Sequence, residues 1–362
     1  MVGPDPEGLG GISRVVKLWM STRLFRDQNI VYIVSTDDST RNKIITLLRS
    51  VIKFGLHCCT KPRLVYIHTA SNNSFYRKSI FILFSMLFGK KIILHIHPSF
   101  FFTFLSGMNG MKKKVFFKLL QHVDRFIVLS KEMHVNMSTL FPHKAIYILP
   151  NPVDIQGMQS GKQIPRDNNR ILYLGWYNRA KGVYDLVDAI DLLLSQGISI
   201  STDFYGTKEI EQLCRYVKDK GLDGCIHVHD WANNEKKIKA LKQATMLVLP
   251  SYSEGIPNVI LEAMASKVPI ISTLVGGLTD VLRDGDNALI IKPGNIHDIA
   301  AKIKLALDNP KLRDRIAENA YKDAKKYFKL ENIVNAFGKM VHEFALTRDS
   351  ETCCADQGSL KK

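Results

Sequence analysis

The chain has 362 residues, 46% of them hydrophobic, which is enough apolar surface for two packed domains. Its formal net charge of +16 is unevenly spread, because residues 1–165 carry +14 and residues 166–362 carry +2. This composition excludes a largely disordered chain, and the basic first half predicts a polyanionic partner.

Neither a membrane span nor a metal site is expected from the sequence. The longest apolar run, 79–88, has ten residues, whereas a span needs about 20, so we expect a buried helix there. The start from Met1 to Pro4 lacks the basic and then apolar pattern of a signal peptide, which predicts a cytoplasmic protein. The six cysteines show neither CxxC nor Cys/His ligand spacing, so we expect reduced thiols and no structural metal.

Apolar runs of strand length alternate with stretches long enough for crossover helices. In the first half, strands are expected at residues 30–34, 64–67, 91–97, 126–129 and 146–149. In the second half, they are expected at residues 171–174, 200–205, 226–228, 245–249, 270–272 and 289–291. This alternation predicts an α/β fold with two parallel sheets.

A polar stretch with glycines, 156–169, predicts the boundary between domains that we place at 1–160 and 161–329. Ligands of such folds bind at the carboxyl ends of the strands, so the site is expected in the cleft between the domains. Residues 347–362 are expected to form a disordered tail.

A glycine loop near the start and a histidine pair are the first candidate site residues. Gly10 and Gly11 precede a helix expected to begin near residue 12, and glycines there let backbone amides approach an anion, although a simple turn is the alternative. His97 ends the strand at 91–97 and shares a face with His95. A third ligand is not evident, so no metal is expected at this pair.

Two cations follow the first strand of the second domain. Arg179 and Lys181 come shortly after Gly175. Fixed positive charges at that place can stabilise a departing nucleoside diphosphate without a metal.

Two glutamates frame the segment with the strongest chemical signal. Glu254 lies in a loop after the strand at 245–249, and Glu262 lies in a helix expected over 258–265. A helix start flanked by carboxylates suits a sugar joined to a diphosphate.

The run SEGIPNVILEAMA resembles the paired-glutamate signature of the GT4 glycosyltransferases, which are retaining enzymes of the GT-B fold. Further matches fall in the family's order along nearly the whole chain: Gly10-Gly11, Asn151-Pro152-Val153-Asp154, Gly175 with Lys181-Gly182, and Gly276-Gly277. The resemblance implies two Rossmann-like domains facing each other across a cleft. It also implies a last helix, residues 330–346, that crosses back onto the first domain.

The resemblance also implies residue roles. Glu262 is expected to bind the donor ribose, Glu254 and His97 the transferred sugar, and Lys181 with Arg179 the diphosphate. The rest of the expected donor site consists of Gly10, Gly11, Gly206, Gly255, Ile256, Pro257, Asn258 and Val259. The base is expected near His229, Asp230 and Trp231. A nucleotide diphosphate sugar is the implied donor, with no metal and no cofactor.

Two features depart from the family's pattern. The family arginine usually follows the glycine directly, where this chain has Trp176, so Arg179 is expected to act from a shifted position. The family's first strand normally precedes the Gly10-Gly11 loop, yet only Met1 and Val2 stand before Gly3-Pro4. That strand is therefore expected to be reduced, unless the chain begins late.

The basic first half suggests where the acceptor is. Between Ser39 and Val123 there are fourteen basic residues and no acidic one. Phenylalanines at 100–102, 104, 116 and 117 flank the lysine triplet 112–114, which predicts contact with an anionic membrane rather than nucleic acid. A phenylalanine core with solvated lysines is the alternative. We expect a peripheral enzyme on the inner face of the cytoplasmic membrane, acting on a lipid-linked saccharide in polysaccharide or glycolipid synthesis.

Two other functions share these features. A nucleotide-sugar 2-epimerase has the same fold and needs no acceptor, and a noncatalytic membrane-binding scaffold suits the short start and Trp176. Lys181-Gly182 together with the two glutamates favours the transferase.

Overall fold

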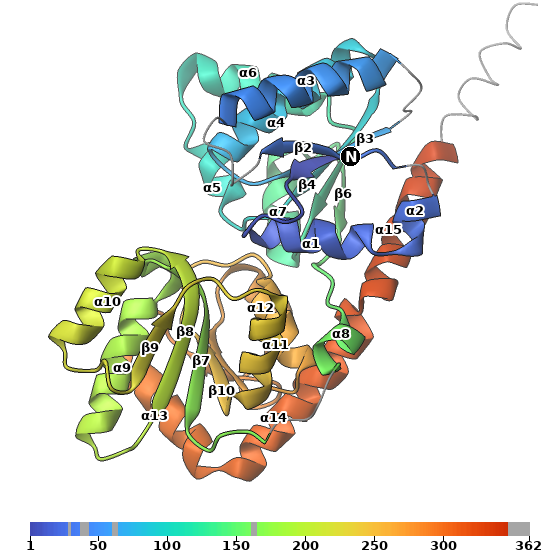
Figure 1. Ribbon diagram of the computed structural model, residues 1–362. Helices are drawn as coiled ribbons and strands as arrows, with labels where there is room; N and C mark the ends of the chain where they lie inside the picture. Colours follow the sequence, from blue (N-terminus) through green and yellow to red (C-terminus); the bar gives the residue numbers. More distant parts are fainter. Residues whose placement is uncertain (28–29, 37–42, 60–63, 161–164, 347–362) are drawn as a thin grey trace, which may run out of the picture.

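The computed structural model describes residues 1–27, 30–36, 43–59, 64–160 and 165–346, and it forms two α/β domains and a long last helix (Figure 1). Each domain is built on a six-stranded sheet, and the strands of each sheet pair in parallel. The predicted fold of two doubly wound α/β domains is therefore confirmed.

The sheet of the first domain has the strand order β2-β1-β3-β4-β5-β6. Its strands are β1 (Val2–Pro4), β2 (Ile33–Thr36), β3 (Leu64–Thr69), β4 (Lys91–Ile96), β5 (Arg125–Val128) and β6 (Ala145–Ile148). Its helices are α1 (Gly11–Met20), α2 (Arg23–Asp27), α3 (Lys43–Cys59), α4 (Asn73–Leu87), α5 (Phe101–Ser106), α6 (Gly110–Gln121) and α7 (Lys131–Leu140). The short β1 lies between β2 and β3, so the first strand is reduced but present.

The sheet of the second domain has the order β12-β11-β10-β7-β8-β9. Its strands are β7 (Arg170–Tyr177), β8 (Ser201–Lys208), β9 (Ile226–His229), β10 (Met246–Leu249), β11 (Ile270–Thr273) and β12 (Leu289–Ile291). Its helices are α9 (Val183–Ser195), α10 (Ile210–Asp219), α11 (Asn234–Gln243), α12 (Asn258–Ala265), α13 (Ile296–Asp308) and α14 (Pro310–Asp323). Shorter turns of helix are η1 (Arg179–Lys181), η2 (Gly276–Asp280) and η3 (Ala324–Phe328).

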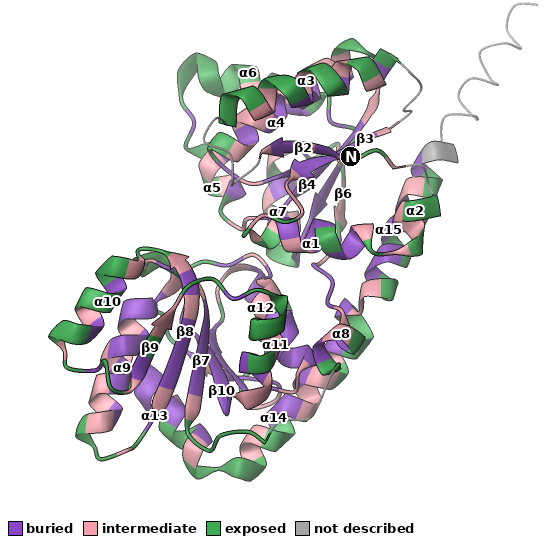
Figure 2. Cartoon of the chain, viewed as in Figure 1, coloured by how far each residue is buried: buried purple, intermediate pink, exposed green. Residues whose placement is uncertain are grey.

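Helices cover both faces of the sheets, which explains why the strands are apolar runs without alternation. All four residues of β10 are buried, for example, and the inner strands of both domains are mostly buried in Figure 2. Burial on two faces is the usual condition of parallel sheets. The segment 79–88 forms the second half of α4 and its C-cap, but it is buried on one face only: Phe81 and Ile82 are inaccessible, whereas Leu83, Leu87 and Phe88 are exposed. Within the described part of the chain, no helix combines the length and apolar character needed to cross a membrane.

The predicted linker contains a short helix, α8 (Ile155–Gln159), that packs against α12. The side chain of Asp154 caps α8 by accepting a hydrogen bond from the Gly157 amide at 2.9 Å. The chain therefore reaches the surface of the second domain before residue 161. Of the predicted boundary segment, residues 161–164 lie outside the described residues, as does the predicted tail at 347–362.

The last helix, α15 (Leu330–Leu346), runs from the second domain back to the first (Figure 1). Its buried side chains join a core cluster with α1 and with one face of β3, β4 and β5. The ring centroids of Trp19 and Phe337 lie 4.5 Å apart within this cluster. The first domain therefore takes part of its core from the end of the described chain.

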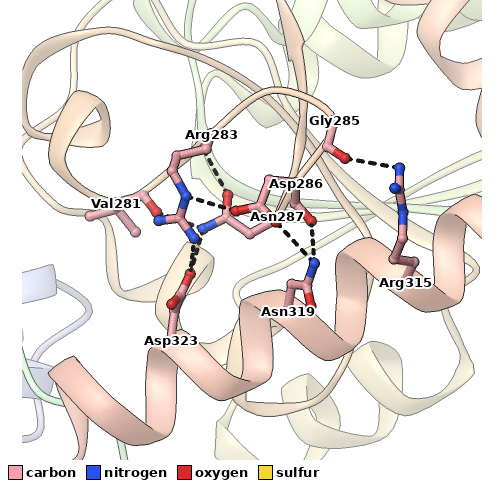
Figure 3. Close-up of polar contacts among 8 residues, drawn as sticks. All are labelled: Val281, Arg283, Gly285, Asp286, Asn287, Arg315, Asn319 and Asp323. Atoms are coloured by element: carbon pink, nitrogen blue, oxygen red, sulfur yellow. Dashed lines mark hydrogen bonds and ion pairs between the residues drawn. The ribbon is translucent and has the colours of Figure 1, made fainter.

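A polar network holds the turn between η2 and β12 on α14 (Figure 3). The fully buried amide of Asn287 donates to the carbonyl of Val281 and to Asp323, both at 2.9 Å. Arg283 donates to the same Asp323 carboxylate at 2.6 Å. Because every buried polar group is paired here, the network fixes the segment that follows Gly276-Gly277.

Candidate functional site

The loop between β10 and α12 holds Glu254 in a buried position. The Glu254 side chain is 8% exposed, and its Oε1 lies 2.7 Å from Nζ of Lys181. The hydroxyl of Ser251 donates to the same oxygen at 2.8 Å. A buried carboxylate needs such partners, so the structure joins two of the predicted site residues in one ion pair.

The turn η1 separates Arg179 from Lys181. The side chain of Asn178 caps this turn by accepting a hydrogen bond from the Lys181 amide at 3.1 Å. A 3₁₀ helix has three residues per turn, so side chains two positions apart point in different directions. Lys181 reaches Glu254, whereas the Arg179 guanidinium lies 5.5 Å from the ring centroid of Tyr184. The structure thus does not bring the two predicted cations together.

The position of the family's arginine is occupied by Trp176, and Arg179 lies away from Glu254. Trp176, at that position, has its side chain 41% exposed, with the Lys208 ammonium 5.2 Å from its ring. Arg179 also lines a surface hollow with Asp185 and Tyr252. In this arrangement Arg179 faces that hollow and not the Lys181–Glu254 pair.

Glu262 meets two cations that the sequence reading missed. It lies in the second turn of α12 and is 4% exposed. Its Oε1 is 2.5 Å from Nζ of Lys237 on α11 and 3.3 Å from Nε of Arg14 on α1. Arg14 belongs to the first domain, so this ion pair joins the domains. The sequence could have indicated Arg14, because it stands three residues after Gly11 of the predicted glycine loop.

Four further contacts close the junction between the domains around the same loop. The Asn258 amide donates to the Gly11 carbonyl at 2.9 Å, and the Asn151 amide donates to the Ile256 carbonyl at 2.7 Å. The backbone amide of Lys131 donates to Asp280 at 2.6 Å, and the Ser99 and Ser253 hydroxyls are 3.1 Å apart. The predicted donor loop therefore lies directly between the two domains.

Gly255 is needed because the junction leaves no room for a side chain. A Cβ at this position would lie 2.5 Å from the carbonyl oxygen of His97. Real contacts of this kind are never so short, so the loop backbone packs directly on the end of β4. The contact between Gly255 and the His97 carbonyl therefore joins the loop that carries Glu254 to the segment that carries His97.

Two helix starts at the junction have no side-chain cap. Gly10 precedes α1 and Pro257 precedes α12, and neither residue has a side chain that can accept a hydrogen bond from the first turn. Val259, in the first turn of α12, is half-buried. Helix starts without a side-chain cap favour an anion. Gly206, by contrast, pairs with Gly175 inside the sheet, where a Cβ would lie 2.1 Å from the Gly175 carbonyl.

The residues after β9 border a hollow of about 650 Å³ between the sheet and α11. The imidazole of His229 stacks on Tyr205, with ring centroids 4.4 Å apart, and its Nε2 is 2.8 Å from Asp203. Burial alone raises the pKa of Asp203, but hydrogen bonds with Arg170 and His229 bring it below its usual value. Asp230 and Trp231 line the same hollow. It lies on the α11 side of the sheet.

A third histidine joins the pair predicted from sequence. His68 on β3 lies against His95 and His97, and the nearest nitrogens of His68 and His97 are 2.9 Å apart. Burial lowers the pKa of His97 to about 3 and those of His68 and His95 well below their usual value. All three imidazoles are therefore neutral. The sequence did not reveal His68 because β3 and β4 are far apart in the chain.

Comparisons with known proteins agree with this geometry. Residues 155–323 match the family profile of the glycosyl transferases group 1. An uncharacterized glycosyltransferase of Methanocaldococcus jannaschii is 28% identical over 254 residues, which are 70% of this chain and 68% of that protein. The capsular polysaccharide biosynthesis glycosyltransferase CapM of Staphylococcus aureus is 27% identical over 186 residues, 48% of this chain and 47% of CapM.

The fold has counterparts among solved structures. Anabaena HepE in complex with UDP and glucose has a TM-score of 0.75 at 15% identity, over 94% of this chain and 98% of that chain. The two Rossmann-like domains therefore have the GT-B fold. Residues 155–323 match the glycosyl transferases group 1, and the relatives support a glycosyltransferase.

Proposed function

We propose that the protein is a retaining, GT4-like enzyme that moves a sugar from a nucleotide diphosphate sugar to a saccharide acceptor. The observation that carries the proposal is the pair of buried glutamates at one helix start between the domains. Glu254 is held by Lys181 and Glu262 by Lys237 and Arg14. HepE, solved with UDP and glucose, supports UDP as the first nucleotide to test.

Each group at the junction has a role in this proposal. Glu262 accepts hydrogen bonds from the ribose, and the first-turn amides of α1 and α12 bind the diphosphate. Glu254 orients the hydroxyls of the sugar. Lys181 stabilises the departing charge, and Arg14 turns from Glu262 to the diphosphate once the ribose occupies that carboxylate.

Transfer proceeds on one face of the sugar. The bond from the anomeric carbon to the diphosphate oxygen breaks while the acceptor hydroxyl attacks from the same side. The acceptor proton passes to the departing diphosphate oxygen, so the step needs no protein nucleophile. Preorganised cations can lower such a barrier by several kcal/mol, so no divalent metal is required for transfer. A trapped covalent glycosyl-enzyme would contradict this mechanism.

The donor site is tested by thermal shift with UDP-, GDP-, ADP- and CMP-linked sugars, without metal. Glu262→Gln is compared with Glu318→Gln, a half-exposed glutamate on α14 that also pairs with a lysine. We expect one donor to raise the melting temperature of wild type and Glu318→Gln but not of Glu262→Gln, because binding stabilises the folded state. Binding without transfer to any acceptor favours a scaffold, and a changed nucleotide sugar without acceptor favours a 2-epimerase. If no nucleotide sugar in the panel raises the melting temperature of the wild type, the proposal of a donor site is wrong.

We further propose that the acceptor is lipid-linked and that the enzyme binds the inner membrane surface. Most of the phenylalanines predicted to meet the membrane are covered: Phe101 is 1% exposed, and Phe104, Phe116 and Phe117 are partly buried against the core. Phe100 is 49% exposed. Phe101, Phe104 and Phe116 pack on Phe75, which agrees with the alternative of a phenylalanine core.

A different surface supports the membrane proposal. Four residues one turn apart on α3 form an exposed apolar stripe: Ile44, Leu48, Ile52 and Leu56. Exposed Arg49 and Lys53 flank the stripe, and the adjacent α4 adds exposed Leu87. Apolar and cationic side chains on one helix are typical of binding to anionic lipid surfaces. CapM, named for capsular polysaccharide synthesis, agrees with an acceptor of this class.

Sedimentation with phosphatidylglycerol vesicles tests the surface. We expect the wild type to pellet at low salt and Ile52→Glu to remain largely in solution, because the change places a negative charge within the stripe. Leu305→Glu is the control, since Leu305 is an exposed leucine on a helix of the second domain. Equal sedimentation of both variants, or no sedimentation of the wild type, makes a soluble acceptor the better hypothesis.

A further inference from the structure

We propose that His68, His95 and His97 bind one transition-metal ion of the Zn²⁺ type beneath the domain junction. The site is structural in this proposal and lies apart from the diphosphate chemistry. It does not depend on the proposed donor or acceptor.

Strand pairing creates the cluster. His68 on β3 and His95 on β4 are register partners in the parallel ladder, and His97 follows two positions later on the same face. One nitrogen from each ring lies within 4.8 Å of the others, and Nδ1 of His68 is 2.9 Å from Nε2 of His97. An ion that holds each nitrogen at about 2.0–2.1 Å requires small ring movements, in which His68 and His97 separate slightly and the longer distances shorten.

The hydrogen-bond inventory of the described residues favours a ligand at these rings. Nε2 of His95 and Nε2 of His68 are buried and have no hydrogen-bond partner. A buried polar atom without a partner costs about 1–3 kcal/mol, so bare imidazoles are an unfavourable arrangement. A metal ion bound to His95 Nε2 would remove the cost of leaving that buried nitrogen without a partner. Its Nδ1 is 2.6 Å from the hydroxyl of Tyr66, the kind of outer contact that fixes a ligating ring.

The donor set selects the class of ion. Three neutral imidazoles without a carboxylate in the cluster suit Zn²⁺, Co²⁺, Ni²⁺ or Cu²⁺ and not Mg²⁺ or Ca²⁺, which prefer oxygen. With three protein ligands, a fourth position remains for water.

The consequence for the fold is local. The carbonyl of His97 faces the Gly255 loop, so an ion bound to the imidazoles would fix the end of β4 under that loop. Trp19 packs against His68 and His95, with ring centroids 5.9 and 6.3 Å apart, and closes the other side.

The test uses the full chain after dialysis against a chelator. Titration with Co²⁺ should give visible d–d absorption that saturates at one ion per chain, and Zn²⁺ should remove that signal. His95→Gln should weaken Co²⁺ binding at least 100-fold, and Tyr66→Phe about 10-fold because it removes only the outer contact. His227→Gln, at an exposed histidine on β9, is the matched control and should bind as the wild type does.

Circular dichroism without metal establishes that each variant is folded. The proposal fails if the wild type shows no saturable absorption, or if folded His95→Gln and wild type bind Co²⁺ equally. If His95→Gln does not fold, Tyr66→Phe decides between the outcomes, because unchanged binding there contradicts the site.

Discussion

At the scale of single residues, Lys181 and Glu254 were both predicted as site residues, and the structure joins them in an ion pair that the sequence did not predict. Both residues stand in loops directly after apolar strands, and parallel strands end at one edge of a sheet. Sequence alone did not show which cations face inward. That choice depends on the three-residue turn of η1, which directs Arg179 away from the glutamate that Lys181 binds.

Replacing Lys181 tests this distinction. Lys181→Met should lower kcat about 10²- to 10³-fold, because one fixed charge at the leaving group is lost. Arg179→Met, two positions away, should change kcat less than about threefold by the same argument. Steady-state rates with the donor found in the thermal-shift panel measure both. Comparable losses in the two variants would show that Arg179 moves into the site when the donor binds.

At the scale of elements, the strand positions predicted from the apolar runs were found with ends displaced by at most three residues, whereas the order of the strands within each sheet was not predicted. The contacts between helices and strands could not be predicted from the apolar runs. Arg14 and Lys237 lie on α1 and α11, and they converge on Glu262 only through tertiary packing. The exposed stripe on α3 was also missed, because a helix pattern does not show which apolar face is covered.

The loop at η2 provides a test of close packing on Glu254. Gly276 has a φ of +55°, and a Cβ there would lie 2.0 Å from the Glu254 carbonyl. Gly276→Ala should displace the loop and abolish donor binding in the thermal-shift assay. Gly221→Ala is the matched control: its φ is +68°, but open space surrounds it, so it should cost only the backbone strain of about 1 kcal/mol. Normal donor binding by Gly276→Ala would show that the loop tolerates displacement.

The return of α15 makes a prediction about stability. Phe337 is 6% exposed and packs against Trp19 and Tyr66 of the first domain. Phe337→Ala should lower the free energy of unfolding by about 3–5 kcal/mol, because it leaves a cavity in that cluster. Phe88→Ala, at a residue 39% exposed, should cost less than about 1 kcal/mol. Denaturant titration followed by tryptophan fluorescence separates the two, and a small effect of Phe337→Ala would mean that α15 only rests on the first domain.

At the scale of the whole molecule, the two domains are coupled through the carboxylate that is proposed to bind the donor. Among the ion pairs of the described residues, Arg14 with Glu262 is the one that joins the two sheet domains. The pair is partly solvated, since the Arg14 side chain is 22% exposed, so its own contribution to closure is at most about 1 kcal/mol. Domain closure without donor therefore depends more on the backbone contacts of Gly11, Ile256 and Gly255.

The coupling gives a prediction that separates two roles of Arg14. If Arg14 turns to the diphosphate, Arg14→Gln should weaken binding of the nucleoside diphosphate about 10-fold or more, since a charged hydrogen bond is lost. Binding of the nucleoside without phosphates should stay unchanged or tighten, because the ribose no longer competes with Arg14 for Glu262. Calorimetry with both ligands measures this difference, with Arg179→Gln as the control expected to match the wild type. If Arg14→Gln binds the nucleoside and the nucleoside diphosphate more tightly to the same degree, Arg14 only competes with the ribose for Glu262. Lys181 would then remain the sole cation proposed to act on the departing diphosphate.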